Sequence, residues 1–289
     1  MTDPLLSVRN LRVSFPTRTG TFEAVRGVSF DLGRERLGVV GESGSGKSMT
    51  GRAILGLVRP PGKVTADQMD LEGQSILNLA PRQMRKIRGR RISMVMQDPK
   101  FSLNPVMTIG AQIIEAYRQN TGASRGEARA KAMEMLEAVQ IRDPARVFKA
   151  YPHEVSGGMG QRIMIAMMLA PNPEILIADE PTSALDVSVR SEVLGIMDRL
   201  VRDRGMGLIF VSHDLNLVSQ FCDRVLIMYA GRVVEELQAK DLHKARHPYT
   251  QGLLNSLPRL DHPVERLEVL TRQESWRTEE IETNFPGGI

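Results

Sequence analysis

The chain has 289 residues, of which 42% are hydrophobic and 25% are charged. This length suits one large α/β domain, or a domain of about 200 to 250 residues with an extension. The composition disfavours disorder, and the longest apolar run, Ile163 to Ala170, falls far short of the roughly 20 residues of a membrane helix. We therefore expect a folded domain that does not cross a bilayer by itself.

Charge and cysteine content narrow the class of protein further. The 38 Lys and Arg residues against 34 Asp and Glu residues give a net charge of +4, which by itself indicates neither nucleic acid nor a membrane surface as a partner. The single cysteine, Cys222, excludes an internal disulfide and a multi-thiolate metal site. The first residues lack the pattern of a secretory signal, so we expect a protein of the reducing cytoplasm.

Two strands are predicted near the start of the chain, because apolar and polar residues alternate there. The first covers Leu6 to Phe15 and the second covers Ala24 to Leu32. A loop that contains Pro16 and Gly20 is expected to join them.

A glycine-rich segment follows the next predicted strand, Leu37 to Val40, and precedes a predicted helix that ends at about Leu57. The segment Gly41-Glu42-Ser43-Gly44-Ser45-Gly46-Lys47-Ser48 fits the pattern G-x-x-x-x-G-K-[ST] of a phosphate-binding loop. Its glycines let backbone N–H groups surround a phosphate, Lys47 reaches the terminal phosphates and the Ser48 hydroxyl can ligate Mg²⁺. A glycine-rich surface turn is the alternative, which the strand-to-helix context disfavours. The chain is expected to bind a nucleoside triphosphate.

The middle of the chain changes from strand to helix. The predicted elements are a strand at Ile92–Met96, which ends at Gln97-Asp98-Pro99, and helices at about Ile109–Asn120 and Gly126–Val139. Ser124 and Glu127 have the spacing of a capping box, and Glu127 and Lys131 have that of an i,i+4 ion pair. We predict a helical subdomain inserted at about residues 98–160.

Two adjacent carboxylates, Asp179 and Glu180, end a buried strand at Ile175 to Ala178. Neighbouring side chains at a strand end point in different directions, so Asp179 can hold the magnesium shell while Glu180 faces the attacking water as general base or polarising group. An apolar strand that ends in Asp-Glu is often only a solvated loop. The phosphate loop elsewhere in the chain reduces the weight of that alternative.

A doubly wound parallel sheet is predicted by three apolar strands separated by helices, the last at Leu208 to Val211. The stretch Arg224 to Glu236 predicts an antiparallel hairpin at the sheet edge, with Ala230-Gly231 at the turn. After about Lys240 the chain becomes polar and rich in proline, which indicates a C-terminal extension.

A second candidate anion site, Ser156-Gly157-Gly158, opens an apolar helix. Together with the phosphate loop and the carboxylate pair, this run resembles the ATP-binding subunits of ABC transporters. The resemblance implies an α/β P-loop NTPase fold: a RecA-like parallel core with an antiparallel β subdomain, an α-helical subdomain and a short C-terminal extension. It also implies a head-to-tail dimer with two sandwiched ATP molecules, in which the signature Ser-Gly-Gly contacts the γ-phosphate held by the opposite subunit.

Other motifs of the family follow in order. Gln97 resembles the Q-loop glutamine, Ser183-Ala184-Leu185-Asp186 resembles the D-loop, and His213 resembles the switch histidine. Phe15 is the first candidate for the aromatic that stacks on adenine; Phe22 competes with it, and core packing is the alternative for both. The resemblance assigns catalysis to Lys47, Gln97, Glu180 and His213, Mg²⁺ ligation to Ser48, Gln97 and Asp179, and nucleotide contacts to the phosphate loop with Met49, Phe15, Ser156-Gly157-Gly158 and Asp186.

Further segments are similar to the ATPases of oligopeptide, dipeptide and nickel importers. They include Ser102-Leu103-Asn104-Pro105, Tyr151-Pro152-His153-Glu154 and His247-Pro248-Tyr249-Thr250. This similarity implies two integral-membrane permeases, a second ABC ATPase in a heterodimer or homodimer, an external solute-binding protein, and a peripheral position on the cytoplasmic face of the bacterial inner membrane. Peptides are the favoured cargo, with nickel, opines or sugars as alternatives. The ATP-binding domain is placed at 1–245 and the extension at 246–289.

Two features depart from patterns found in the family. Met159 stands where many ABC proteins have Gln, although this subfamily often has Met, and Gly160 stands where a basic residue is common. Some subfamily members bind an iron–sulfur cluster through C-terminal cysteines. With Cys222 alone this chain cannot, and Cys222 is expected to be a small buried hydrophobe on a helix.

Two other functions compete with an importer ATPase. A soluble ABC ATPase acting on nucleic acid is suggested by the basic stretch Arg82 to Arg91, but this stretch has no aromatic residues on which bases could stack. A solvated face, or a face toward permease and lipid headgroups, is favoured, and no nucleic acid is expected. A non-hydrolysing partner in an asymmetric dimer ranks last, because every hydrolytic motif is present.

Overall fold

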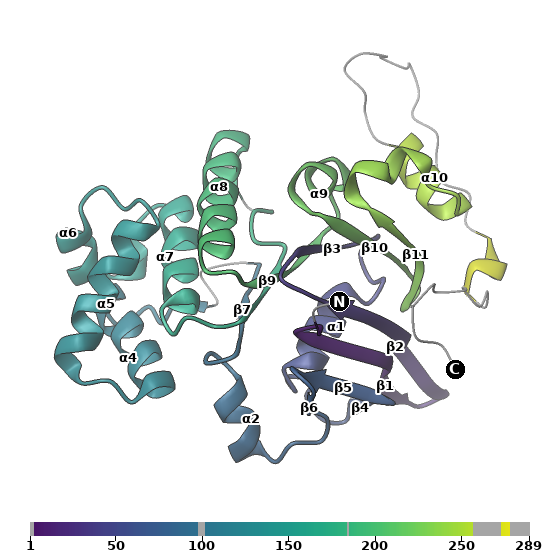
Figure 1. Cartoon of the computed structure of the whole chain (residues 1–289), viewed down its shortest axis with the longest axis horizontal. Helices are drawn as coiled ribbons and strands as arrows, with labels where there is room; N and C mark the ends of the chain where they lie inside the picture. Colours follow the sequence, from purple (N-terminus) through teal and green to yellow (C-terminus); the bar gives the residue numbers. More distant parts are fainter. Residues whose placement is uncertain (1–2, 98–101, 184, 257–272, 278–289) are drawn as a thin grey trace. The chain divides into compact units, whose positions relative to one another are not determined.

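The computed structural model describes residues 3–97, 102–183, 185–256 and 273–277. The chain forms two compact units (Figure 1). The first unit comprises Met1–Leu77 and Phe210–Ile289, and the second comprises Asn78–Ile209. Within the described ranges, every helix is too short or too polar to cross a membrane. The domain boundaries predicted from the sequence stay a prediction.

An antiparallel sheet lies in the first unit, with strand order β2-β1-β5-β6 and β4 paired to β1. Its strands are β1 (Leu6–Thr17), β2 (Gly20–Leu32), β4 (Lys63–Thr65), β5 (Gln68–Leu71) and β6 (Gln74–Ser75). The last three have only two to four residues, too few to show an alternating pattern, so they were not predicted from the sequence.

The expected loop around Pro16 and Gly20 is wrong, because β1 and β2 form one long hairpin. Pro16 pairs with Thr21, and Thr17 pairs with Gly20. Proline lacks an N–H, so it is tolerated in a strand where that side forms no hydrogen bonds to a neighbouring strand. β4 pairs only with Arg12 to Ser14, so its ladder ends before Pro16.

Three strands of the first unit carry the phosphate loop and the predicted hairpin. β10 (Arg224–Tyr229) runs parallel to β3 (Arg36–Val40) and antiparallel to β11 (Arg232–Gln238), which confirms the hairpin. β9 (Gly207–Ser212) begins in the second unit and ends in the first. The helical segments of this unit are α1 (Lys47–Ile54), α9 (Leu215–Phe221), η2 (Ala239–Lys244), α10 (Pro248–Asn255) and η3 (Glu274–Arg277).

The second unit combines a parallel strand pair with helices. β7 (Ile92–Val95) pairs in parallel with β8 (Ile175–Asp179). Four of the helices, α4 to α7, gather into one group (Figure 1). The helical segments are α2 (Pro81–Ile87), α4 (Ile109–Thr121), α5 (Arg125–Ala138), α6 (Pro144–Lys149), η1 (Pro152–Glu154), α7 (Gly157–Leu169) and α8 (Val187–Asp203).

The start of α5 shows one confirmed and one wrong prediction. The Ser124 Oγ accepts from the Glu127 N–H at 3.3 Å, and the Glu127 carboxylate accepts from the Ser124 N–H at 2.8 Å, so the capping box forms. The expected pair between Glu127 and Lys131 is wrong: Lys131 instead bonds Glu134 at 2.6 Å. The Glu127 side chain turns back toward the N-terminus to cap the helix.

Cys222 is buried, as expected, although it follows α9 rather than lying on it. A Cβ built on Gly38 of β3 would lie 3.2 Å from the Cys222 Sγ and 2.5 Å from Val218 Cγ1, so the thiol packs directly against the strand. Burial raises the pKa of the Cys222 thiol. The thiol is therefore an inert packing group.

Cys222 should react with a water-soluble disulfide reagent roughly tenfold or more slowly in the folded protein than in guanidinium, since its thiol is buried and protonated. The chain has no other cysteine, so the release of the coloured thiolate reports this site alone. Equal rates in the two solvents would contradict the packing described here.

Candidate functional site

The phosphate loop connects β3 to α1 in the first unit, as the sequence predicts. Gly46 occupies the N-cap position of α1 in the left-handed conformation, with φ near 100°, and has no side chain to cap the helix. No acidic residue lies in the first turn. The positive end of the helix dipole thus faces no capping side chain and no carboxylate of its own helix, which suits an anion.

Close backbone contacts give this loop its shape. A Cβ on Gly41 would lie 2.1 Å from the Met228 carbonyl oxygen of β10, and a Cβ on Gly46 would lie 2.6 Å from the Ala24 carbonyl oxygen of β2. No side chain fits at either distance. The loop also bonds to the turn between β10 and β11, where the Gly231 N–H donates to the Ser45 carbonyl at 3.0 Å.

Lys47 is buried inside the loop. Its ammonium donates to the carbonyl oxygens of Gly41 at 2.7 Å and Glu42 at 2.8 Å, and to the Ser45 Oγ at 3.4 Å. Lysine is a flexible point charge with three donors, so it can exchange a loop acceptor for a phosphate oxygen.

The two aromatic candidates for adenine stacking are direct partners across the β1–β2 hairpin, since Phe15 pairs with Phe22. Phe22 is 59% exposed, whereas Phe15 is half-buried and packs over Gly62. The choice between them stays a prediction. Their pairing places both rings at one end of the hairpin.

His213 directly follows β9 and is exposed. The next residue, Asp214, caps α9 by accepting from the Leu217 N–H at 3.0 Å. The histidine therefore lies between the end of a buried strand and a capped helix, on a short and well-defined connection.

In the second unit, the structure brings two predicted catalytic residues together. Gln97 follows β7 and Glu180 follows β8, and the parallel pairing of these strands puts both residues at one edge. The Gln97 Nε2 donates to the Glu180 Oε2 at 3.2 Å. Asp179, which directly precedes Glu180, is buried. Asp98 and Pro99 lie outside the described residues.

Glu180 has a left-handed backbone, with φ near 47°. This conformation costs a non-glycine residue about 1 kcal/mol or more, and residues held in it cluster at functional sites. Its carbonyl accepts from the Ser183 N–H at 3.3 Å and from the Ser183 Oγ at 3.1 Å. The strand end and the following turn thus hold Glu180 in place.

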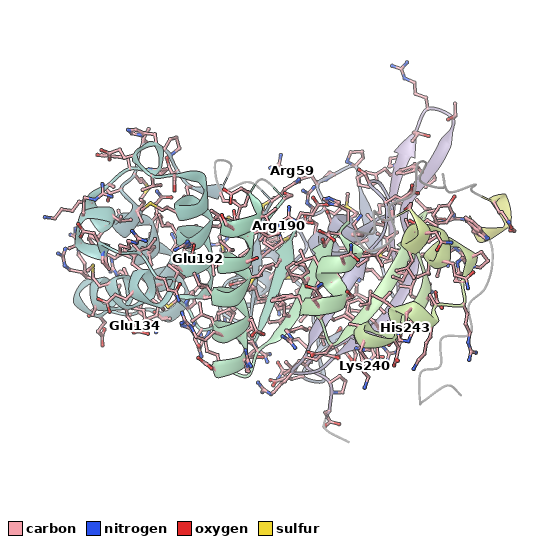
Figure 2. The ribbon with its side chains drawn as sticks, turned by 90° about the horizontal axis from the view of Figure 1, so that it is seen from above. Arg59, Glu134, Arg190, Glu192, Lys240 and His243 are labelled. Carbon is pink, nitrogen blue, oxygen red and sulfur yellow. The ribbon has the colours of Figure 1, made fainter. Side chains whose placement is uncertain are left out.

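Ser156 caps the N-terminus of α7, accepting from the Met159 N–H at 3.3 Å. Gly158 packs against α8, because a Cβ there would lie 2.5 Å from Val189 Cγ1. Arg162 and Glu192 form an ion pair between the same two helices; Figure 2 labels Glu192 on α8. The Ser-Gly-Gly segment is therefore an exposed helix start on a fixed support.

Asp186 caps α8, accepting from the Val189 N–H at 3.0 Å and from the Ser188 hydroxyl at 2.7 Å. These hydrogen bonds hold the pKa of the Asp186 carboxyl below its ordinary value. Val189 thus contacts Gly158 of α7 with its side chain, and its backbone N–H donates to Asp186 of the predicted D-loop. Neither Val189 nor the loop contact Met228 stands out in the sequence, because each acts through tertiary packing. Ala184 of the D-loop lies outside the described residues.

The site residues fit ATP and Mg²⁺ on chemical grounds. The glycine cradle is closed to side chains and opens onto a helix N-terminus, which suits phosphate. Oxygen atoms, which Mg²⁺ prefers as ligands, are present on Ser48 in the first unit and on Gln97 and Asp179 in the second, and their joint ligation of Mg²⁺ stays a prediction. Among the described residues, no group of three His, Cys, Asp or Glu side chains could hold another metal.

The basic stretch from Arg82 to Arg91 is partly neutralised. Arg91 forms a two-point ion pair with Glu174, with distances of 2.8 and 2.6 Å. The stretch includes α2 and ends at β7. Arg91 is thus held by a carboxylate, whereas the role of the other basic residues of the stretch stays a prediction.

Comparisons with known proteins agree with this geometry. A family model described as "ABC transporter" matches residues 25–183, and one described as "Oligopeptide/dipeptide transporter, C-terminal region" matches residues 234–287. The dipeptide transport ATP-binding protein DppD of Bacillus subtilis is 47% identical over 262 residues, covering 90% of this chain and 78% of the relative. The oligopeptide transport ATP-binding protein OppD of Escherichia coli is 45% identical over 261 residues, covering 90% and 77%.

Solved structures give the same result. A dimeric ATP-binding cassette in a post-hydrolysis state, bound to ADP and phosphate, matches with a TM-score of 0.72 and 27% identity over 81% of this chain and 98% of that chain. Fold and loop together define a P-loop nucleotide-binding protein. The chain belongs to the ABC transporter family, in which it is an ATP-binding subunit with ATPase activity.

Gly41→Ala should abolish tight ATP binding and destabilise the protein by roughly 2 kcal/mol or more, because the new Cβ meets a strand carbonyl that cannot move cheaply. The matched control is Gly126→Ala, on the exposed start of α5 with no atom within 4 Å of the added Cβ. Calorimetry with ATP and urea unfolding measure both effects. Wild-type affinity in Gly41→Ala would refute the close packing of the loop.

Proposed function

We propose that this chain is the ATP-hydrolysing subunit of an ABC importer that takes short peptides across the bacterial inner membrane. The observation that carries the proposal is the held geometry of Glu180, which has a left-handed backbone and a side chain bonded to Gln97 at 3.2 Å. The phosphate loop supplies the nucleotide site. The names of the relatives, which are dipeptide and oligopeptide transport ATP-binding proteins, support the cargo.

Hydrolysis then depends mainly on positioning and on charge stabilisation. The loop N–H groups and Lys47 bind the phosphates, and Glu180 accepts a proton from the attacking water. His213 is assigned to the γ-phosphate. Ser48, Gln97 and Asp179 would hold Mg²⁺, which would supply positive charge to offset that of the phosphates.

A dimer completes the proposed site. The exposed N-terminus of α7, with Ser156 as its cap, is suited to bind the γ-phosphate held by a second ATPase subunit. The solved relative named above is itself dimeric. Two permeases and an external solute-binding protein complete the proposed transporter, with this chain peripheral on the cytoplasmic face. The second ATPase is a related chain or another copy of this one.

Glu180→Gln should keep ATP affinity within about threefold and lower turnover by roughly 100-fold or more, because the amide cannot accept the proton from water. The assay is phosphate release by the assembled transporter in vesicles. Glu137→Gln, the same change at an exposed position of α5, is the control and should be neutral. Unchanged turnover in Glu180→Gln would refute the catalytic role.

The same vesicles test the cargo. ATP hydrolysis by the wild-type complex should rise when the solute-binding protein is loaded with a dipeptide or oligopeptide. It should not rise with nickel or with a sugar. Stimulation by nickel or sugar alone would assign the importer to that cargo instead.

A further inference from the structure

One residue of the C-terminal segment reaches the phosphate loop. Tyr249 of α10 is fully buried, and its hydroxyl accepts a hydrogen bond from the Glu42 N–H at 3.1 Å. The two residues are 207 positions apart in the sequence. Tyr249 lies within residues 234–287, which match the oligopeptide/dipeptide transporter C-terminal family, and that match assigns no role to the tyrosine.

The contact acts on the peptide group between Gly41 and Glu42. The N–H of this group is held by Tyr249, and its carbonyl, that of Gly41, accepts from the Lys47 ammonium at 2.7 Å. A peptide group is planar, so fixing one end fixes the direction of the other. Tyr249 therefore sets the direction of a carbonyl that anchors Lys47.

Tyr249 is itself firmly placed. Its own N–H donates to the His247 Nδ1 at 3.1 Å, and His247 caps α10. The Glu235 carboxylate of β11 accepts from the N–H groups of Arg246 at 2.6 Å and His247 at 3.3 Å. These bonds tie the start of α10 to the hairpin whose turn also contacts the loop.

An aromatic cluster closes around the ring. The Tyr249 ring lies 4.6 Å from that of Tyr229 and 6.0 Å from that of Trp276, and Trp276 is also buried. Such tilted ring pairs stabilise beyond the area they bury. The phenol is thus held at its ring while its hydroxyl points to the loop.

We propose that Tyr249 is a positioning residue for Lys47 and for ATP phosphate binding, and that the C-terminal segment is thereby part of the nucleotide site. This rests on the proposed function, in which Lys47 binds the phosphates of ATP. Without the hydroxyl, the half-buried Glu42 N–H loses this acceptor, so the Gly41 carbonyl is held less firmly toward Lys47.

The test is calorimetry of ATP binding to the full-length chain with Tyr249→Phe, which removes only the hydroxyl. Affinity should fall about five- to tenfold, the effect of removing the acceptor of one half-buried donor. The matched control is Tyr229→Phe, which removes a hydroxyl from the same cluster while keeping the ring. Its affinity should equal that of the wild type.

A second readout separates positioning from simple loss of stability. Trp276 is the only tryptophan, so its emission reports whether the cluster stays packed, and thermal unfolding reports stability. Both are recorded well below and through the unfolding transition. Weaker ATP binding by Tyr249→Phe with unchanged Trp276 emission supports the proposal.

Two results would overturn it. Wild-type affinity in Tyr249→Phe, even with a lower unfolding midpoint, would make the tyrosine a packing residue only. An equal loss in Tyr229→Phe would show that the cluster, and not the hydroxyl, is responsible. Lys47→Ala checks the underlying function separately: if it binds ATP as tightly as the wild type, the nucleotide site itself is wrongly assigned.

Discussion

The contact between Gly41 and the Met228 carbonyl sets the geometry on which the nucleotide site depends. A Cβ on Gly41 would lie 2.1 Å from that oxygen, so only glycine lets the chain leave β3 this close to the neighbouring strand β10. The parallel pairing of these strands and the turn after β10 then hold both sides of the loop. The phosphate cradle is thus formed by backbone against backbone, and we expect it to keep this shape without a ligand.

In the second unit, backbone conformation likewise fixes the position of Glu180. The backbone strain at this residue is held by the buried strand before it and by the Ser183 contacts after it. The signature segment has its own support, because Gly158 brings α7 close enough to touch Val189 of α8. In each case the functional residue lies at the end of a helix or strand that is itself packed.

The sequence predicted those parts of the molecule that depend on local pattern. The glycine loop, the α5 capping box and the hairpin of β10 and β11 all follow from residue types at short spacing. The very short strands β4 to β6 have too few residues to show a period. The predicted ion pair between Glu127 and Lys131 was wrong because the Glu127 side chain can either cap the helix or pair with Lys131, and it caps the helix.

Contacts between distant segments could not be predicted in this way. In the sequence, the segment His247-Pro248-Tyr249-Thr250 indicates only similarity to a subfamily. No residue near Tyr249 in the sequence predicts its contact with Glu42. Likewise, Phe15 and Phe22 appeared as rivals, although the hairpin register makes them partners. Long-range partners of this kind depend on the register of strands and on the tertiary packing.

Hydrogen exchange of the full-length chain without nucleotide tests most directly whether the loop is formed in advance. The account predicts slow exchange, roughly 100-fold or more below that of an unstructured chain, for the N–H groups of Glu42, Ser45 and Gly231. Each donates to an acceptor within the loop or its frame. Exchange of these groups at the unstructured rate until ATP is added would contradict the account.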